Sequence, residues 1–255
     1  MPAEPLPENF VMSTDRSLAG KRPFATTQWS VVLAAGQDRS ETSRQALAQL
    51  CEVYWYPLYA YIRGRVENVH EAQDLTQEFF SELLERQTIA KAQPDRGRFR
   101  AFLLTCLKNF LNNAWQKNQR QKRGGGQCIL SLDFVNAESR LSREPSHDAT
   151  PEKLFERRWV LAVLHQVLEM LQDQLVRDGK SAYFDQLKGC LTGSATAADY
   201  DRAAAKLNIT PGAAKQATYR LKKQYRQLFR EEIGRTLENQ RDIDDEMAHM
   251  LQYLS

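Results

Sequence analysis

Apolar residues recur at three- and four-residue steps through most of the chain, which is the pattern of amphipathic helices with one buried face. The clearest case begins at Phe99 and stops at Trp115, where a polar and basic run begins. No segment shows the strict alternation of a half-buried strand. The pattern therefore predicts an all-α fold. The apolar stripe of this clearest helix consists of Phe99, Phe102, Leu103, Cys106, Leu107, Phe110, Leu111 and Ala114.

The same periodicity predicts further helices along the chain. Pro57 falls inside one of them and is expected to kink it, because proline lacks the amide hydrogen that a helix interior needs. Asn68 starts another, and Glu71 three residues later completes a sequence typical of a capping box. The predicted helices cover residues 29–35, 43–66, 151–178, 181–191, 198–207, 211–233 and 242–254; another begins at Asn68, and the helix that begins at Phe99 continues into a basic end near residue 123.

Breaks in the periodicity divide the chain into five parts. Residues 1–24 are polar and rich in proline, and we expect them to be disordered. Residues 25–123 form a first helical domain, and residues 124–151 form a linker that starts with three glycines and lacks a helical period. Residues 152–234 form a second helical domain, and residues 235–255 form an acidic helical extension.

Charge is strongly segregated, although the net charge of the chain is only +3. Residues 95–123 contain eight Lys/Arg and one acid, and residues 202–230 contain eight Lys/Arg and no acid. Residues 67–86 contain six acids and one base, and residues 231–246 contain seven acids and two bases. This distribution predicts two surfaces for an anionic partner and at least one surface for a basic partner.

Several classes of protein are disfavoured by the sequence. The four cysteines are not spaced as CxxC and suggest no disulfide pairing, which fits the reducing cytoplasm. The four histidines form no metal-ligand pattern, so we expect no metal and no cofactor. The first residues lack the basic start and apolar core of a signal peptide, and no stretch of about eighteen apolar residues predicts a membrane span.

The polar end of the helix that begins at Phe99 has the chemistry of a nucleic-acid contact. Arg and Lys neutralise phosphates, Asn and Gln pair with base edges, and an aromatic such as Trp115 stacks on an unpaired base. The alternative is a solvated helix end that stops at Gly124.

Residues 200–221 have the pattern of a helix-turn-helix motif. Asn208 stands at the turn position that usually requires glycine, because the backbone there often has positive φ. Thr210 and Pro211 then form a good N-cap and first helical position. The inward face of the second helix is predicted to contain Ala213, Ala214, Ala217 and Leu221. A plain helical hairpin with a basic outer face is the alternative.

With these two segments, the chain resembles bacterial RNA polymerase sigma factors of the extracytoplasmic-function (ECF) class. Residues 74–80 (DLTQEFF), residues 97–104 (GRFRAFLL) and the basic helix end are similar to region 2 of that family. Residues 200–229 are similar to its region 4, although Arg202 begins a triplet where the family commonly has Glu-Ile-Ala, and Asn208 replaces a glycine. The opening Thr-Thr-Gln-Trp-Ser and the acidic last helix resemble long, planctomycete-like members of the class.

The resemblance implies a non-enzymatic transcription initiation factor of the cytoplasm, whose partners are the core polymerase, promoter DNA and, in this class, an anti-sigma factor. The residues implied to bind the clamp helices of the polymerase's large subunit are Asp74, Gln77, Glu78 and Phe79. Those implied to melt and recognise the −10 element are Lys108, Asn109, Asn112, Asn113, Trp115, Gln116, Asn118, Arg120, Lys122 and Arg123. Those implied to recognise the −35 element are Thr210, Lys215, Gln216, Tyr219, Lys222 and Lys223.

Two other hypotheses remain. A helix-turn-helix regulator that binds duplex DNA without polymerase explains residues 200–230, but not the second basic surface or the acidic helix. An all-helical enzyme has little support, since the chain lacks a glycine-rich phosphate loop and a nucleophile elbow. Glu71, Asp74 and Glu78 share one helix face and could hold a metal, but no Glu-x-x-His helix accompanies them.

Overall fold

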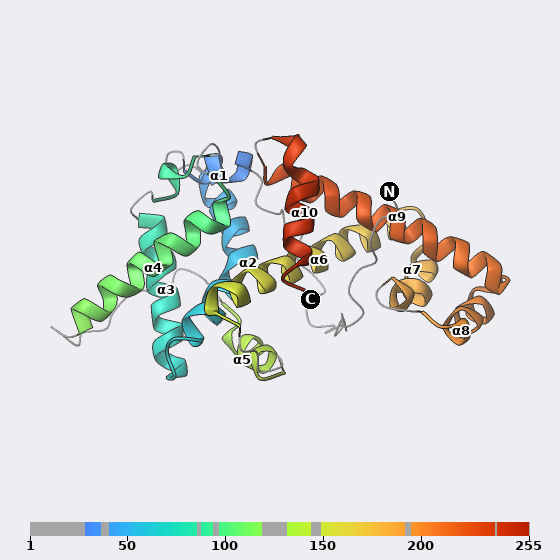
Figure 1. Cartoon of the computed structure of the whole chain (residues 1–255), viewed down its shortest axis with the longest axis horizontal. Helices are drawn as coiled ribbons and strands as arrows, with labels where there is room; N and C mark the ends of the chain where they lie inside the picture. The colour runs from blue at the N-terminus through green and yellow to red at the C-terminus, as the bar shows by residue number, and fades with distance from the viewer. Residues whose placement is uncertain are drawn as a thin grey trace. The chain divides into compact units, whose positions relative to one another are not determined.

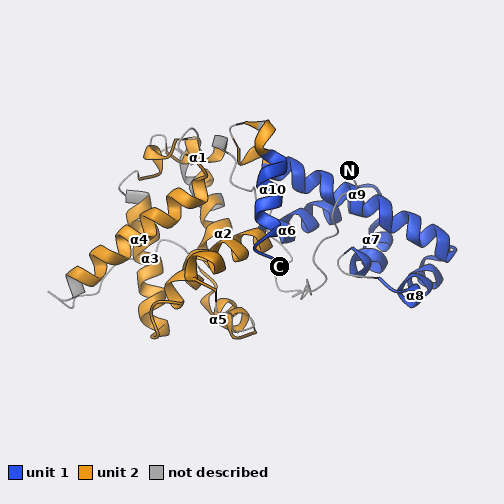
Figure 2. Cartoon of the chain, in the orientation of Figure 1, with its two compact units in different colours: residues 1–23, 163–233, 243–255 blue, residues 24–162, 234–242 orange. Residues whose placement is uncertain are grey.

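The computed structural model describes residues 29–36, 41–85, 88–93, 97–118, 132–143, 149–191, 195–237 and 239–254 (Figure 1). Every regular element in these ranges is an α-helix or a short 3-10 helix, which confirms the all-α fold class. The chain divides into two compact units, coloured in Figure 2. Unit 2 comprises residues 24–162 and 234–242, and unit 1 comprises residues 163–233 and 243–255 together with the first 23 residues.

Unit 2 is built around a long central helix, α2 (Glu41–Arg63). Its second half is buried on nearly all sides, and Tyr54, Leu58 and Ile62 are each at most 1% exposed. Such a helix needs neighbours on every face. They include α1 (Trp29–Ala35), α3 (Val69–Glu85) and α4 (Phe99–Asn118), while η2 (Thr88–Lys91) packs against α1 and α3.

The apolar stripe of α4 is the face that packs into unit 2. Phe99, Leu103, Leu107 and Leu111 are all buried, as the periodicity predicts. Phe99 meets Tyr54 of α2 edge to face, with 5.7 Å between ring centroids. Because this stripe is buried, only the opposite face of α4 is available to a partner.

The predicted linker contains a helix that the sequence pattern did not reveal, α5 (Phe134–Arg143). Phe134 lies against Trp55 and Tyr59 of α2, with 6.1 and 5.0 Å between ring centroids. The Arg140 guanidinium lies 4.1 Å from the ring centroid of Tyr56. Contacts with α2 therefore stabilise a short helix whose few apolar residues lie in a polar segment. Residues 1–24, the glycines at 124–126 and the turn at 94–96 lie outside the described residues.

The long helix α6 (Pro151–Arg177) contributes its first part to unit 2 and its remainder to unit 1. In unit 1 the Tyr225 hydroxyl donates a hydrogen bond of 2.9 Å to the backbone carbonyl of Leu164, which joins α9 to α6. The other elements of unit 1 are α7 (Ser181–Leu187), η4 (Lys188–Cys190), α8 (Ala197–Leu207), α9 (Pro211–Arg235) and α10 (Ile243–Leu251).

The predicted acidic extension folds as η5 (Gln240–Asp242) followed by α10. Ile243 and Met250 of α10 are buried, and the Asp244 carboxylate forms a two-fold ion pair with the Arg230 guanidinium of α9. The helix of this extension therefore packs within unit 1. Across the described residues, no helix is long and apolar enough to cross a membrane.

Candidate functional site

The outer face of α3 carries the predicted acidic surface. Asp74 and Glu78 are exposed and Gln77 is half-buried, while the opposite side of the helix faces the core. The helix begins as the sequence predicts, because the Glu71 amide donates a 3.1 Å hydrogen bond to Oδ1 of Asn68. Asp74, Gln77 and Glu78, one turn apart, thus form a surface on a well-anchored helix.

Phe79 differs from the other three residues predicted for this surface, because it is 3% exposed. Its ring lies 5.5 Å from that of Phe110 in α4 and 5.7 Å from that of Phe80. The side chain therefore supports the acidic face from behind, and a rigid partner would not touch it.

The outer face of α4 carries the amides of the predicted −10 surface. Asn109, Asn112, Asn113 and Gln116 are exposed, and Trp115 is 36% exposed at the end of the buried stripe. The side chain of Asn118 and the whole of Arg120, Lys122 and Arg123 lie outside the described residues. The described part of this surface is thus rich in amides and carries one partly exposed aromatic.

Two cations of this segment are engaged by α6, contrary to a simple count of surface charge. The Arg100 side chain is only 2% exposed, and its Nε donates to Oε2 of Glu156 at 2.7 Å. Its guanidinium also lies 4.3 Å from the ring centroid of Trp159. Lys108 Nζ lies 2.9 Å from Oε1 of Glu152. The Arg100 side chain therefore packs against α6 and is not available to a partner. The Lys108 side chain is partly exposed, but its charge is paired with Glu152.

Glu152 collects donors from two other helices. Its Oε1 accepts from the Tyr61 hydroxyl at 3.0 Å and from Arg65 Nη2 at 3.1 Å, in addition to Lys108. The hydrogen bond from Lys108 is the main cause that lowers the pKa of this carboxyl to about 2. Burial, and then the hydrogen bond to Glu152, raise the pKa of Tyr61 to about 12.

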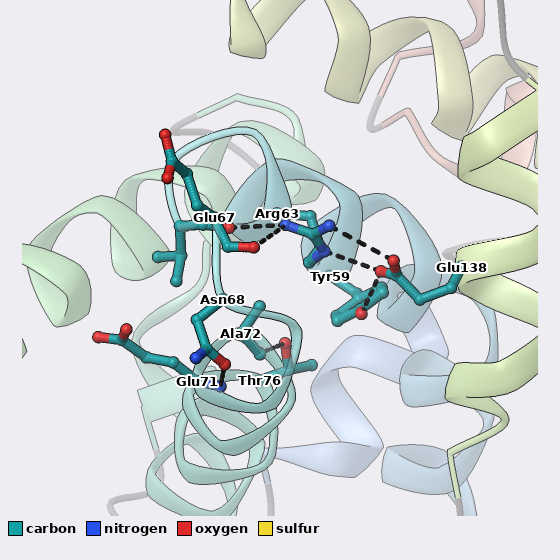
Figure 3. A network of polar contacts seen from close by, with 9 residues as sticks. Tyr59, Arg63, Glu67, Asn68, Glu71, Ala72, Thr76 and Glu138 are labelled. Carbon is teal, nitrogen blue, oxygen red and sulfur yellow. Dashed lines mark hydrogen bonds and ion pairs between the residues drawn. The ribbon is translucent and has the colours of Figure 1, made fainter.

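A second carboxylate is held on α2 in a similar way, as Figure 3 shows. Glu138 of α5 accepts from the Tyr59 hydroxyl at 2.5 Å and from Arg63 Nε at 2.8 Å. Arg63 Nη1 also donates to the backbone carbonyls of Val66 and Glu67, at 2.7 and 3.2 Å. The hydrogen bond from Arg63 is the main cause that holds the pKa of Glu138 below its usual value.

In unit 1, α8 and α9 are joined by the three-residue turn that the sequence predicts. Asn208 has φ 54° and ψ 46°, the left-handed conformation expected at this position. The Ala213 amide donates a 3.2 Å hydrogen bond to Oγ1 of Thr210, which confirms the N-cap. At the other end of α8, the Asp199 carboxylate accepts from both the amide and the hydroxyl of Thr196, at 2.9 and 2.7 Å.

The outer face of α9 places the predicted −35 residues in solvent. Lys215, Gln216 and Lys223 are exposed, Tyr219 is 72% exposed and Lys222 is half-buried. Lys215 Nζ lies 5.7 Å from the ring centroid of Tyr200 on α8. Arg220 and Arg226 are also exposed on α9. They are absent from the predicted −35 residues, although their place in a basic helix is a signal that the sequence contains. Within the described ranges, no group of three or more His, Cys, Asp or Glu could hold a metal ion.

Comparison with known proteins identifies one domain. Residues 54–121 match the family model for Sigma-70 region 2, a range that begins in α2 and includes α3 and α4. No curated protein and no solved structure matches the chain. The acidic face of α3 and the amide-rich face of α4 thus belong to a Sigma-70 region 2 domain, which supports a sigma-70 family factor.

Proposed function

We propose that the protein is a non-enzymatic sigma factor that binds core RNA polymerase and directs transcription initiation at promoters with −10 and −35 elements. The observation that carries the proposal is the match of residues 54–121 to Sigma-70 region 2, because this range contains both predicted surfaces of unit 2. Region 2 supports polymerase binding and promoter melting, and each activity has a suitable surface here.

The acidic face of α3 is the proposed contact for the clamp helices of the polymerase's large subunit. Asp74, Gln77 and Glu78 present their side chains from a helix whose back is buried, so a basic partner can dock without deforming it. Charge complementarity of this kind steers association and determines the partner.

The exposed face of α4 is the proposed −10 surface. Asn109, Asn112, Asn113 and Gln116 can pair with base edges, and Trp115 can stack on a base that has left the duplex. The proposed surface extends to Asn118 and to Arg120, Lys122 and Arg123, and the last three supply the positive charge for the phosphates.

The α8–turn–α9 element is the proposed −35 reader, a helix-turn-helix in which α9 enters the major groove. Its capped start, its left-handed Asn208 and its exposed Lys215, Gln216 and Tyr219 support the assignment. The corresponding domain division is region 2 in residues 25–123 and region 4 in residues 152–234. The contacts of α5 and of the first part of α6 with α2 and α4 add both segments to the structural unit around region 2.

Within the sigma-70 family, we propose a long ECF-class factor of the planctomycete-like type that acts in the cytoplasm and responds to an anti-sigma factor or to its own extensions. The C-terminal extension supports the second mode of control, since α10 is held to α9 by Arg230 and Asp244.

A helix-turn-helix regulator that works without polymerase is the second candidate, and the α8–turn–α9 element is the observation that favours it. Two assays on the full chain separate the candidates. A sigma factor binds core polymerase in a pull-down and supports run-off transcription from a genomic promoter library. A chain that binds duplex DNA but not core polymerase would support the regulator and overturn the sigma-factor proposal.

A further inference from the structure

The end of α2 and the turn that follows it carry two interleaved Tyr-x-x-x-Arg pairs, and each pair holds a glutamate from a later segment. Tyr59 and Arg63 hold Glu138, and Tyr61 and Arg65 hold Glu152. Tyr59 and Arg63 are four residues apart on one face of α2, whereas Arg65 lies in the turn after α2 and reaches Glu152 from there. The two pairs differ in one respect, because only the second is joined by a cation from α4.

The second cluster has the geometry of an anion site. Three donors of different kinds converge on the single oxygen Oε1 of Glu152: the Tyr61 hydroxyl at 3.0 Å, Arg65 Nη2 at 3.1 Å and Lys108 Nζ at 2.9 Å. Tyr61 is fully buried, and the Arg65 guanidinium lies 4.6 Å from its ring centroid, so two of the donors are held in place by packing. Arginine, lysine and hydroxyl donors around one oxygen suit a phosphate as well as a carboxylate.

The present occupant is accessible to a competitor. The side chains of Arg65, Lys108 and Glu152 are 29%, 40% and 36% exposed. Ion pairs with this degree of exposure contribute little to stability, so an incoming anion loses little by replacing one.

The cluster also lies in line with the proposed −10 surface. Lys108, Asn112 and Trp115 are spaced i, i+4 and i+7 on α4, and such positions share one face of a helix. An anion bound beside Lys108 would therefore be followed along α4 by the amide and the aromatic ring proposed to contact bases. A backbone phosphate of a nucleic-acid strand is an anion with bases attached to the same strand, so the neighbouring bases can reach Asn112 and Trp115.

We propose that Tyr61, Arg65 and Lys108 form a binding site for a backbone phosphate of the promoter strand that lies on α4, and that Glu152 occupies this site when DNA is absent. The proposal rests on the proposed function for the identity of the DNA. Entry of the phosphate displaces the Glu152 carboxylate, so the first turn of α6 loses its contacts with α2 and α4 as DNA binds.

The test compares two charge-neutralising variants of the full chain. Glu152→Gln removes the competitor and keeps its shape, and Glu138→Gln makes the same change in the matched Tyr-Arg pair that lacks an α4 lysine. The probe is a short fluorescent single-stranded oligonucleotide, titrated by anisotropy at about 50 mM salt, where phosphate contacts are strong. We expect Glu152→Gln to bind about two- to five-fold more tightly than the wild type, the range of an exposed ion pair, and Glu138→Gln to bind as the wild type does.

Two further arms identify the residue and the ligand. In a Lys108→Ala background, Glu152→Gln should lose most of its gain, because the cation that the phosphate would use is gone. An oligonucleotide of the same sequence with uncharged methylphosphonate linkages should bind Glu152→Gln and wild type equally. Circular dichroism melts of each variant establish that the comparison is made between folded proteins.

Several results would overturn the proposal. Equal affinity of wild type and Glu152→Gln, an equal gain in Glu138→Gln, or a gain that persists with the uncharged probe each excludes a phosphate site at this cluster. Inorganic phosphate that saturates the site and leaves oligonucleotide binding unchanged would assign it to a free anion instead of DNA. Core binding and run-off transcription by the wild type report on the sigma-factor proposal separately, so failure of either proposal is recognised independently.

Discussion

At the scale of single residues, Asp74 and Glu78 offer a test of polymerase binding that does not disturb the fold. Both side chains are exposed on α3, and the neighbouring Phe79 anchors the helix from the buried side. We expect Asp74→Arg combined with Glu78→Arg to preserve the helical circular dichroism spectrum and to abolish core binding, since attraction for a basic partner becomes repulsion. A titration with fluorescently labelled core polymerase measures the effect.

A variant with the same change in net charge is the control for this double substitution. Asp173 and Asp245 are exposed acids on α6 and α10 in unit 1, whereas α3 belongs to unit 2. Asp173→Arg combined with Asp245→Arg should bind core polymerase as the wild type does. If the Asp74 and Glu78 variant bound core with unchanged affinity, α3 would not be the contact.

The buried ion pair of Arg100 and Glu156 is a second residue-scale feature with a measurable consequence. Arg100 is 2% exposed, so loss of the Glu156 carboxylate removes an anionic partner from a charge in a poorly solvated site. Loss of one partner of a buried pair commonly costs about 3–5 kcal/mol. We expect Glu156→Ala to lower the free energy of unfolding by about 3 kcal/mol in a urea titration, and Glu156→Gln, which keeps an acceptor, to lower it less. A loss below about 1 kcal/mol for Glu156→Ala would show that Arg100 finds another partner.

At the scale of elements, the turn between α8 and α9 shows why a residue-level prediction from sequence can succeed. Asn208 has φ 54°, where a side chain with a β-carbon is strained unless it is Asn or Asp. We expect Asn208→Ala to destabilise unit 1 by roughly 1–2 kcal/mol and Asn208→Gly to be nearly neutral, because glycine adopts this conformation freely. Chemical denaturation of the two variants checks the order, and equal stability of both would mean that the turn relaxes to another conformation.

Most of the longer helices were predictable, and the short helix α5, which depends on distant partners, was not. The bounds predicted for α1, α6, α8 and α9 and the start predicted for α4 agree with the structure within about two residues, because regularly spaced apolar residues or a recognisable cap mark each of them. By contrast, α5 lies in a polar segment, and a short isolated helix is marginal without tertiary contacts. Its contacts to Trp55 and Tyr59 come from residues more than seventy positions away, which periodicity cannot reveal.

The residues of the candidate site were likewise predictable where helix geometry determines their exposure, and not where a distant helix packs against them. The exposed amides of α4 and the outer face of α9 follow from helical geometry, since residues opposite a buried stripe must face solvent. The engagement of Lys108 by Glu152, and the burial of Arg100, depend on where α6 packs. A count of basic residues along the chain therefore overestimates the free positive charge beside the −10 surface.

At the scale of the whole molecule, the two proposed DNA surfaces belong to different units and should act at different steps of initiation. Trp115 can stack only on an unpaired base, whereas Lys215, Gln216 and Tyr219 face a duplex groove. We expect Trp115→Ala to form closed complexes normally and to reduce the permanganate reactivity of −10 thymines. The Lys215, Gln216 and Tyr219 triple alanine variant should instead weaken closed complexes and change the −35 preference in a promoter-library selection.

Two single substitutions on α9 refine this last prediction, because loss of a base contact changes sequence preference, whereas loss of a phosphate contact changes overall affinity. Gln216→Ala should relax the preference at one −35 position at a cost of about 1–3 kcal/mol, while Lys223→Ala should weaken all promoters alike and reduce the salt slope by about one. Lys180→Ala, an exposed lysine at the start of α7, is the control for loss of charge. An unchanged −35 sequence preference for the triple variant would exclude α9 as the helix that recognises the −35 element.

A thermal melt tests the alternative role of Trp115, in which the ring only completes the buried apolar stripe of α4. In that case Trp115→Ala would lower thermal stability and leave melting of the promoter intact.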